Sequence, residues 1–112
     1  MSHVTTHILD ISQGKPAAGV KVVLETQQPG GWQIVSRGTT DDNGRVSNLV
    51  PAERKLSPGI YRLIFDTKSY FFSIHTKAFY PTINIDFEIA DDSHYHVPLL
   101  LSPFGYSTYR GS

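Results

Sequence analysis

The sequence has no cysteine and no long apolar run. The missing thiols exclude a disulfide scaffold, a thiolate zinc site and a cysteine nucleophile. No segment approaches the roughly 18 apolar residues that a membrane span needs. Residues 1–25 also lack a basic segment followed by the apolar stretch of a secretory signal. The sequence therefore predicts a soluble, cytoplasmic protein with no membrane partner.

An excess of charge of either sign is also missing. Ten Lys and Arg residues balance ten Asp and Glu residues, so no basic field exists to attract nucleic acid. The 112 residues fit one domain, since domains usually run to roughly 100–150 residues. With 39% apolar residues, the chain has material for a single core over residues 1–112. A chain this short buries a limited share of its surface, so association between copies would stabilise it.

Turn-forming residues occur at short intervals along the chain, and the segments between them are rich in Val, Ile, Thr, Phe and Tyr. This spacing predicts an all-β sandwich or barrel. Eight strands are expected, at residues 3–9, 18–26, 32–37, 44–47, 59–66, 82–89, 93–101 and 105–110.

One segment, residues 68–75, has helical spacing of its apolar side chains, and Asp66 or Thr67 can cap its first turn. It follows the fifth predicted strand. The larger aromatic residues are expected in the core or between the helix and the sheets, because they bury the most area per residue. These are Trp32, Tyr70, Phe71, Phe72, Phe79 and Tyr80.

The strand at residues 93–101 has no plainly polar face. One side carries Tyr95, Val97, Leu99 and Leu101, and the other carries His94, His96, Pro98 and Leu100. A face that mixes imidazoles with apolar side chains suits a partner subunit or a ligand cavity.

Four of the five histidines fall on two predicted strands: His3 and His7 on the first, His94 and His96 on the seventh. Residues two apart on one face of a strand lie about 6.5–7 Å from each other. Three interpretations are open: structural histidines, a metal site with a His-x-His pair, or general acid–base catalysis. Arg45 is either a solvated edge charge or the cation that catalysis would need.

The residues resemble a known family over nearly the whole chain, the 5-hydroxyisourate hydrolases, which are the transthyretin-related enzymes of urate breakdown. The resemblance is carried by THILD at 6–10, GKPA at 14–17, DNGR at 42–45, GIY at 59–61, DTKSY at 66–70, FYP at 79–81, HYHVPLLLSP at 94–103 and YRGS at 109–112. Four of these features separate the enzymes from transthyretin itself. They are His7, Arg45, His96 and the C-terminal tetrapeptide.

The resemblance implies a transthyretin-like sandwich of two sheets and eight strands, with a short helix after the fifth strand. It also implies a homotetramer, a dimer of dimers in which the first, fourth, seventh and eighth strands line a channel with the active sites. The catalytic positions then correspond to His7, Arg45 and His96. The tail that closes the site corresponds to Tyr109, Arg110, Gly111 and Ser112. Leu9, Pro98, Leu100 and Ser107 are expected to line the cleft.

The implied reaction is hydrolysis of 5-hydroxyisourate to 2-oxo-4-hydroxy-4-carboxy-5-ureidoimidazoline, without a cofactor or a metal. His7 and His96 would hold the attacking water, and Arg45 would stabilise negative charge on the substrate. The sequence leaves open which histidine is the base. Two other functions stay open as well: a carrier that binds an apolar aromatic ligand in the tetramer channel, and a purely structural sandwich domain.

Overall fold

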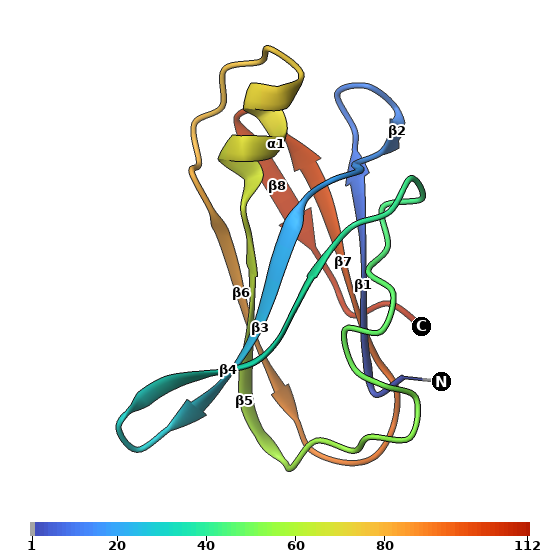
Figure 1. Ribbon diagram of the computed structural model, residues 1–112, viewed down its shortest axis with the longest axis vertical. Helices are drawn as coiled ribbons and strands as arrows, with labels where there is room; N and C mark the ends of the chain where they lie inside the picture. The colour runs from blue at the N-terminus through green and yellow to red at the C-terminus, as the bar shows by residue number, and fades with distance from the viewer. Residues whose placement is uncertain (1) are drawn as a thin grey trace.

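The predicted two-sheet sandwich is confirmed by the computed structural model, which describes residues 2–112. Eight strands form two four-stranded sheets, and one short helix follows the fifth strand (Figure 1). The strands and the helix are β1 Val4–Asp10, β2 Lys15–Pro16, β3 Lys21–Gln28, β4 Gly31–Thr39, β5 Gly59–Phe65, α1 Thr67–Ser73, β6 Ile83–Ile89, β7 Tyr95–Ser102 and β8 Gly105–Thr108.

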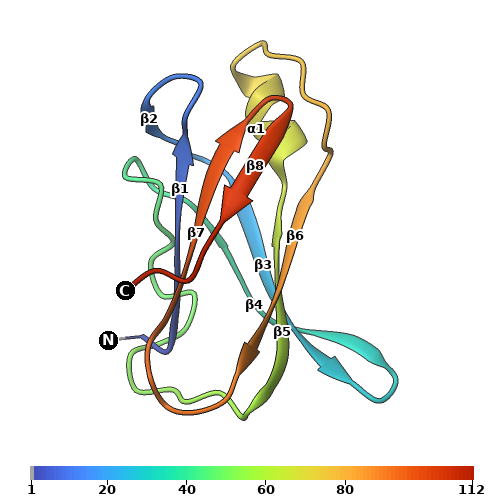
Figure 2. The ribbon, with the colours of Figure 1, turned by 180° about the vertical axis from the view of Figure 1, so that it is seen from behind.

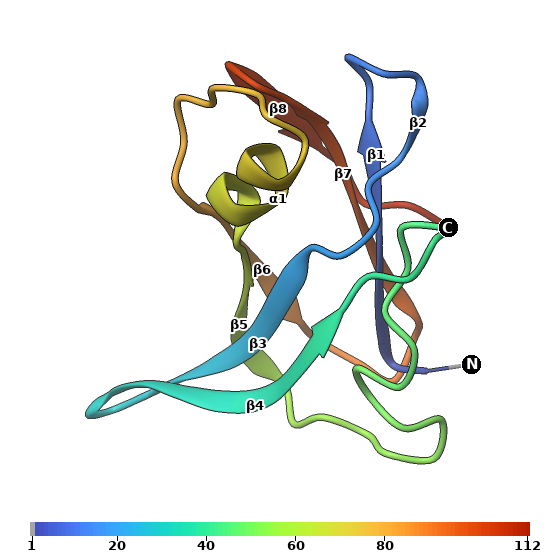
Figure 3. The same ribbon diagram turned by 45° about the horizontal axis from the view of Figure 1, so that its top comes forward.

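One sheet has the strand order β2-β1-β7-β8 and the other has the order β4-β3-β5-β6. Neighbouring strands are antiparallel, except for β1 and β7, which run parallel in the first sheet. The sheets form two layers, and α1 lies at one end of them (Figures 2 and 3). Two strands from opposite ends of the sequence, β1 and β7, therefore lie at the centre of one sheet.

The core lies between the sheets and follows the alternation in the sequence. On β1, Val4, Thr6 and Ile8 are buried, while Thr5 and His7 are partly exposed on the other face. The same period holds on β6, where Asn84, Asp86 and Glu88 are exposed between apolar neighbours, except that Phe87 is only partly buried. On β7 the predicted inward set, Tyr95, Val97, Leu99 and Leu101, is buried. The outer face of β1 and β7 is thus free to carry polar side chains.

The helix α1 begins where the sequence predicts a cap. The Asp66 side chain accepts a hydrogen bond from the backbone N–H of Ser69 and caps the first turn. Tyr70 and Phe71 point into the core, and the Tyr70 hydroxyl donates to the buried carboxylate of Asp10 at 2.7 Å. This bond ties the helix to the end of β1. No helix among residues 2–112 has the length and apolar character to cross a membrane.

Two expectations about local structure are wrong: the strand at residues 44–47 and the burial of several aromatic residues. Residues 44–47 form no strand, because only Arg45 pairs with β1, through an isolated bridge to His7. The edge of the sheet next to β1 is formed instead by the two-residue strand β2. Phe72 and Phe79 are 80% and 69% exposed, so they are not core residues. Tyr80 is also exposed, and Trp32 is partly exposed beneath the guanidinium of Arg62.

Candidate active site

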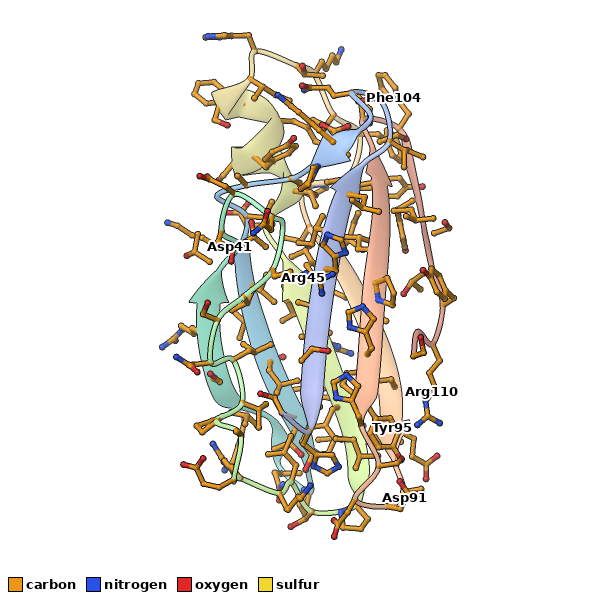
Figure 4. All side chains as sticks on the ribbon, turned by 90° about the vertical axis from the view of Figure 1, so that its right-hand side faces the viewer. Asp41, Arg45, Asp91, Tyr95, Phe104 and Arg110 are labelled. Carbon is orange, nitrogen blue, oxygen red and sulfur yellow. The ribbon has the colours of Figure 1, made fainter. Side chains whose placement is uncertain are left out.

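A groove with a volume of about 530 Å³ opens on the outer face of the β2-β1-β7-β8 sheet. Residues from separate parts of the chain line it: β1, the segment at Arg45 and Val46, the start of β7, and the C-terminal segment. They are Thr5, Thr6, Arg45, Val46, His94, His96, Tyr109, Gly111 and Ser112. Figure 4 looks onto this face, with Arg45 beside β1 and Arg110 on the far side of β7.

A tight turn places Arg45 against β1. The Asp41 carboxylate accepts hydrogen bonds from the backbone N–H groups of Asn43 and Arg45, at 2.9 and 3.1 Å. Gly44 has a φ of +76°, and a Cβ there would lie 2.3 Å from the carbonyl oxygen of Ile8. Only glycine fits both this conformation and this contact. The Asp-Asn-Gly-Arg motif therefore fixes the backbone from which Arg45 extends.

His7 lies opposite Arg45 across an antiparallel bridge, one step further along the outer face of β1 than Thr5. The backbone N–H of Ile8 donates to the carbonyl of Gly44 at 2.8 Å, which holds the turn on the strand. The sequence prediction that His7 and Arg45 come together is consistent with this pairing. His7 itself is absent from the side chains that line the groove, and lies beside it.

His96 lies in the groove, opposite Thr5 in the register of β1 and β7. Its Nδ1 is 2.7 Å from the Thr5 hydroxyl. Burial lowers the pKa of His96 from its ordinary value of 6.5, and the positive charge of Arg45, with smaller effects from His94 and His7, lowers it further. The His96 imidazole is therefore neutral at pH 7 and can accept a proton.

The C-terminal segment runs across the groove and touches His96. The backbone N–H of Gly111 donates to the carbonyl of His96 at 2.8 Å. A Cβ on Gly111 would lie 2.5 Å from Cδ2 of His96, so the segment packs closely only because residue 111 is glycine. Tyr109 and Ser112 also line the groove.

Arg110 is the one member of the tail that points elsewhere. Its guanidinium stacks over the Tyr95 ring at 4.4 Å and donates to the Ser93 hydroxyl and the His94 carbonyl, both at 3.3 Å. These contacts lie at the start of β7 (Figure 4). They anchor the tail to the sheet.

The remaining histidines have separate surroundings. His3 is buried, and its ring accepts from the N–H of Leu56 at 3.0 Å and donates to the carbonyl of Asp91 at 2.9 Å. It therefore does not lie on the outer face with His7, although the alternation along a strand at residues 3–9 would place both on one face. His94 lies in the groove, with its ring nearly parallel to that of His96 and 6.1 Å away.

The family resemblance named Arg45 and His96, which the structure brings into one groove, but it did not name Thr5, whose hydroxyl lies within hydrogen-bond distance of both His94 and His96. The only signal was that Thr5 shares a face with His7; the register that places it opposite His96 is not readable from one strand. Among residues 2–112, no group of three or more His, Cys, Asp or Glu side chains is arranged to hold a metal ion. The groove combines a neutral imidazole with a guanidinium, a pair suited to water activation and oxyanion stabilisation.

Comparisons with known proteins agree with this geometry. The model of the HIUase/transthyretin family matches residues 4–111. A 5-hydroxyisourate hydrolase of Salmonella dublin is 51% identical over 110 residues, which cover 97% of this chain and 80% of that protein.

Two solved structures are similar along nearly their whole length. The 5-hydroxyisourate hydrolase of Klebsiella pneumoniae superposes with a TM-score of 0.85 at 37% identity, covering 97% of this chain and 98% of that one. Sea bream transthyretin in complex with thyroxine superposes with a TM-score of 0.90 at 32% identity, covering 97% and 94%. The sandwich is therefore shared by proteins with different activities, and the site residues have to distinguish them.

Proposed function

The chain belongs to the HIUase/transthyretin family and is a 5-hydroxyisourate hydrolase of uric acid degradation, and we propose that His7, His96 and Arg45 carry out the hydrolysis in the groove. The observation that carries this proposal is the meeting of Arg45 and His96, from segments far apart in the sequence, in one groove on the sheet. A carrier of apolar ligands would have no need of this pair.

The reaction opens the six-membered ring of the substrate at its N1–C6 amide bond. Water attacks the carbonyl carbon C6, and one imidazole takes its proton. The C6–N1 bond of the resulting tetrahedral intermediate then breaks, and the same proton is delivered to N1. His7 and His96 hold the water, and a positioned base of this kind contributes about 10²- to 10⁴-fold to the rate.

Arg45 stabilises the oxygen of C6, which becomes negatively charged in the intermediate. A donor aimed at such an oxyanion contributes on the order of 10²- to 10³-fold. Two features support this role: the rigid turn at Asp41–Arg45 and the position of the side chain in the groove. Base and oxyanion donor together give a large acceleration with no redox step.

The C-terminal segment binds the substrate in this proposal. Tyr109 and Ser112 line the groove and supply hydroxyl groups, while Gly111 lets the backbone approach His96. Arg110 takes part by anchoring the segment through Tyr95 and the backbone of His94.

We also propose that the protein is a homotetramer, a dimer of dimers, in which the grooves lie between subunits. The outer face of the β2-β1-β7-β8 sheet carries Leu9 and Leu100, both partly exposed beside the polar groove, and Ile11 next to it is 57% exposed. An apolar surface of this kind is typical of a subunit contact.

The test of the catalytic assignment follows the ultraviolet absorbance of freshly made 5-hydroxyisourate. His7→Asn and His96→Asn are each expected to bring the decay nearly to its spontaneous rate, and so is Arg45→Met. The matched control is His75→Asn, because His75 lies outside the groove at a φ of +57°, which asparagine accepts readily.

Full activity in His7→Asn or His96→Asn would contradict the assignment. If the wild-type protein leaves the decay unchanged and binds an aromatic ligand such as thyroxine, the carrier function takes its place. Sea bream transthyretin, whose structure contains thyroxine, makes this the second candidate.

A further inference from the structure

Three side chains in the groove form a continuous chain of polar contacts that ends at His96. His94 Nδ1 is 2.6 Å from the carbonyl oxygen of Ser2. His94 Nε2 is 3.1 Å from the Thr5 hydroxyl, and that hydroxyl is 2.7 Å from Nδ1 of His96. We propose that Thr5 and His94 are positioning residues that fix the tautomer of His96 and thereby make His96 the base. This inference rests on the proposed hydrolysis.

The direction of each hydrogen bond follows from the Ser2 carbonyl. A carbonyl oxygen only accepts, so Nδ1 of His94 carries a proton and donates it. In a neutral imidazole the other nitrogen is then an acceptor. Nε2 of His94 therefore receives the hydroxyl proton of Thr5.

A hydroxyl group has a single proton to donate. Because the Thr5 hydroxyl uses its proton toward His94, its oxygen accepts at the contact with His96. Nδ1 of His96 therefore carries the ring proton, and Nε2 of His96 keeps its lone pair. This is the tautomer that a base acting through Nε2 requires.

The other ring nitrogen of His96, Nε2, is accessible to solvent. Within residues 2–112, Nε2 of His96 makes no hydrogen bond. Every buried side-chain nitrogen or oxygen in the same residues does have a hydrogen-bond partner. Nε2 of His96 is therefore not buried. The opposite edge of the ring is held by Thr5, and Cδ2 packs against Gly111. The ring is thus held at its Nδ1 edge, and its basic atom is accessible to water and substrate.

His7 has no comparable chain of contacts among the described residues. His7 lies beside Gly44, opposite its bridge partner Arg45 on one side and Pro98 of β7 on the other. Of the two imidazoles, only that of His96 has its proton assigned by the surrounding hydrogen bonds. His7 is left to hold the water or to donate to the leaving nitrogen.

The kinetic test uses Thr5→Val, which keeps the shape and the β-branched side chain but removes the hydroxyl. We expect kcat to fall on the order of 10- to 100-fold, with KM changed less than about twofold, because a second-layer contact to a reacting group has effects of this size. Thr5→Ser restores the hydroxyl and is expected to recover most of kcat. Thr39→Val, on the exposed surface of β4, is the matched control.

The direct readout is the tautomer itself, measured from the ¹⁵N chemical shifts of the His96 ring. Spectra at pH 8 keep the histidines neutral, since their ordinary pKa is about 6.5. We expect a protonated Nδ1 and an unprotonated Nε2 in the wild type and in Thr5→Ser. A mixture of both tautomers is expected in Thr5→Val and in His94→Phe, which keeps the stacked ring.

A wild-type His96 protonated at Nε2 would overturn the inference, whatever the kinetics. The inference would also be overturned if Thr5→Val kept the wild-type kcat while His96→Asn was inactive. That outcome would leave the proposed hydrolysis intact. A wild-type protein with no activity on 5-hydroxyisourate would instead overturn the proposed function, and the chemical shifts would still decide the tautomer.

Discussion

At His96, burial and charge act on the imidazole in the same direction. Burial is the larger cause of its lowered pKa, and the guanidinium of Arg45 adds to it. A base with a lowered pKa stays neutral to more acidic pH, so the decline of kcat/KM on the acid side should lie at lower pH than an ordinary imidazole, with a pKa of 6.5, would give. The folded state also binds this proton less readily than the unfolded chain, so stability falls as pH drops below 6.5.

A titration of the His96 ring by NMR checks this expectation. Its pKa should lie below 6.5 in the wild type and rise in Arg45→Met, because the substitution removes a positive charge. The other titratable groups that lower it, His94 and His7, are unchanged in that variant. Arg37→Met, on the exposed part of β4, serves as the control. A wild-type pKa above 6.5 would show that burial is not the dominant effect.

Which residues gather at the site was largely predictable, while how they are bonded was not. Arg45 and His96 were named because the sequence resembles the motifs of the family; the strand pattern alone left Arg45 as either a solvated edge charge or a catalytic cation. The role of Thr5 depends on its hydroxyl meeting two rings that lie 89 and 91 positions away. The contacts of Arg110 depend in the same way on the position of Tyr95. Such distant contacts are set by strand register, which one sequence does not specify.

At the scale of the element, the turn at Asp41–Arg45 is a rigid support for the proposed oxyanion donor. Asp41→Ala removes the acceptor for the N–H groups of Asn43 and Arg45, so Arg45 should lose its fixed position. We expect kcat to fall on the order of 10-fold, because small displacements of a catalytic group are costly. Asp41→Asn keeps an acceptor oxygen and should retain most activity. A wild-type kcat in Asp41→Ala would show that the turn does not need this carboxylate.

Most elements were predictable because their alternation of apolar and polar residues is strong. The strand β6 and the capped helix α1 occur within one or two residues of their predicted limits. Residues 44–47 were harder to predict, since Arg45 alone pairs with β1, through its bridge to His7, and the residues after it do not extend this pairing into a strand. The two-residue β2 contains Pro16 and has no pattern at all, so it can only be recognised once β1 is placed beside it.

At the scale of the whole molecule, the apolar part of the outer face is expected to hold subunits together. Leu100→Glu places a charge on that face, beside the groove, and should shift the protein to a smaller species in sedimentation velocity. Ile34→Glu is the matched control, because Ile34 is 49% exposed on β4 in the other sheet. Circular dichroism would show that both variants keep their β structure. Unchanged sedimentation of Leu100→Glu would exclude this face as a contact between subunits.

The parallel pairing of β1 with β7 has a consequence for biosynthesis. Residues 4–10 pair with residues 95–101, so β1 leaves the ribosome well before its partner β7, and the pairing at the centre of this sheet has to wait until β7 is made. Pairings this distant make folding slow, because a long loop must close before its contacts form. A nascent chain that stops short of β7 has the strands of the other sheet, but it lacks His94 and His96 and therefore cannot form the groove.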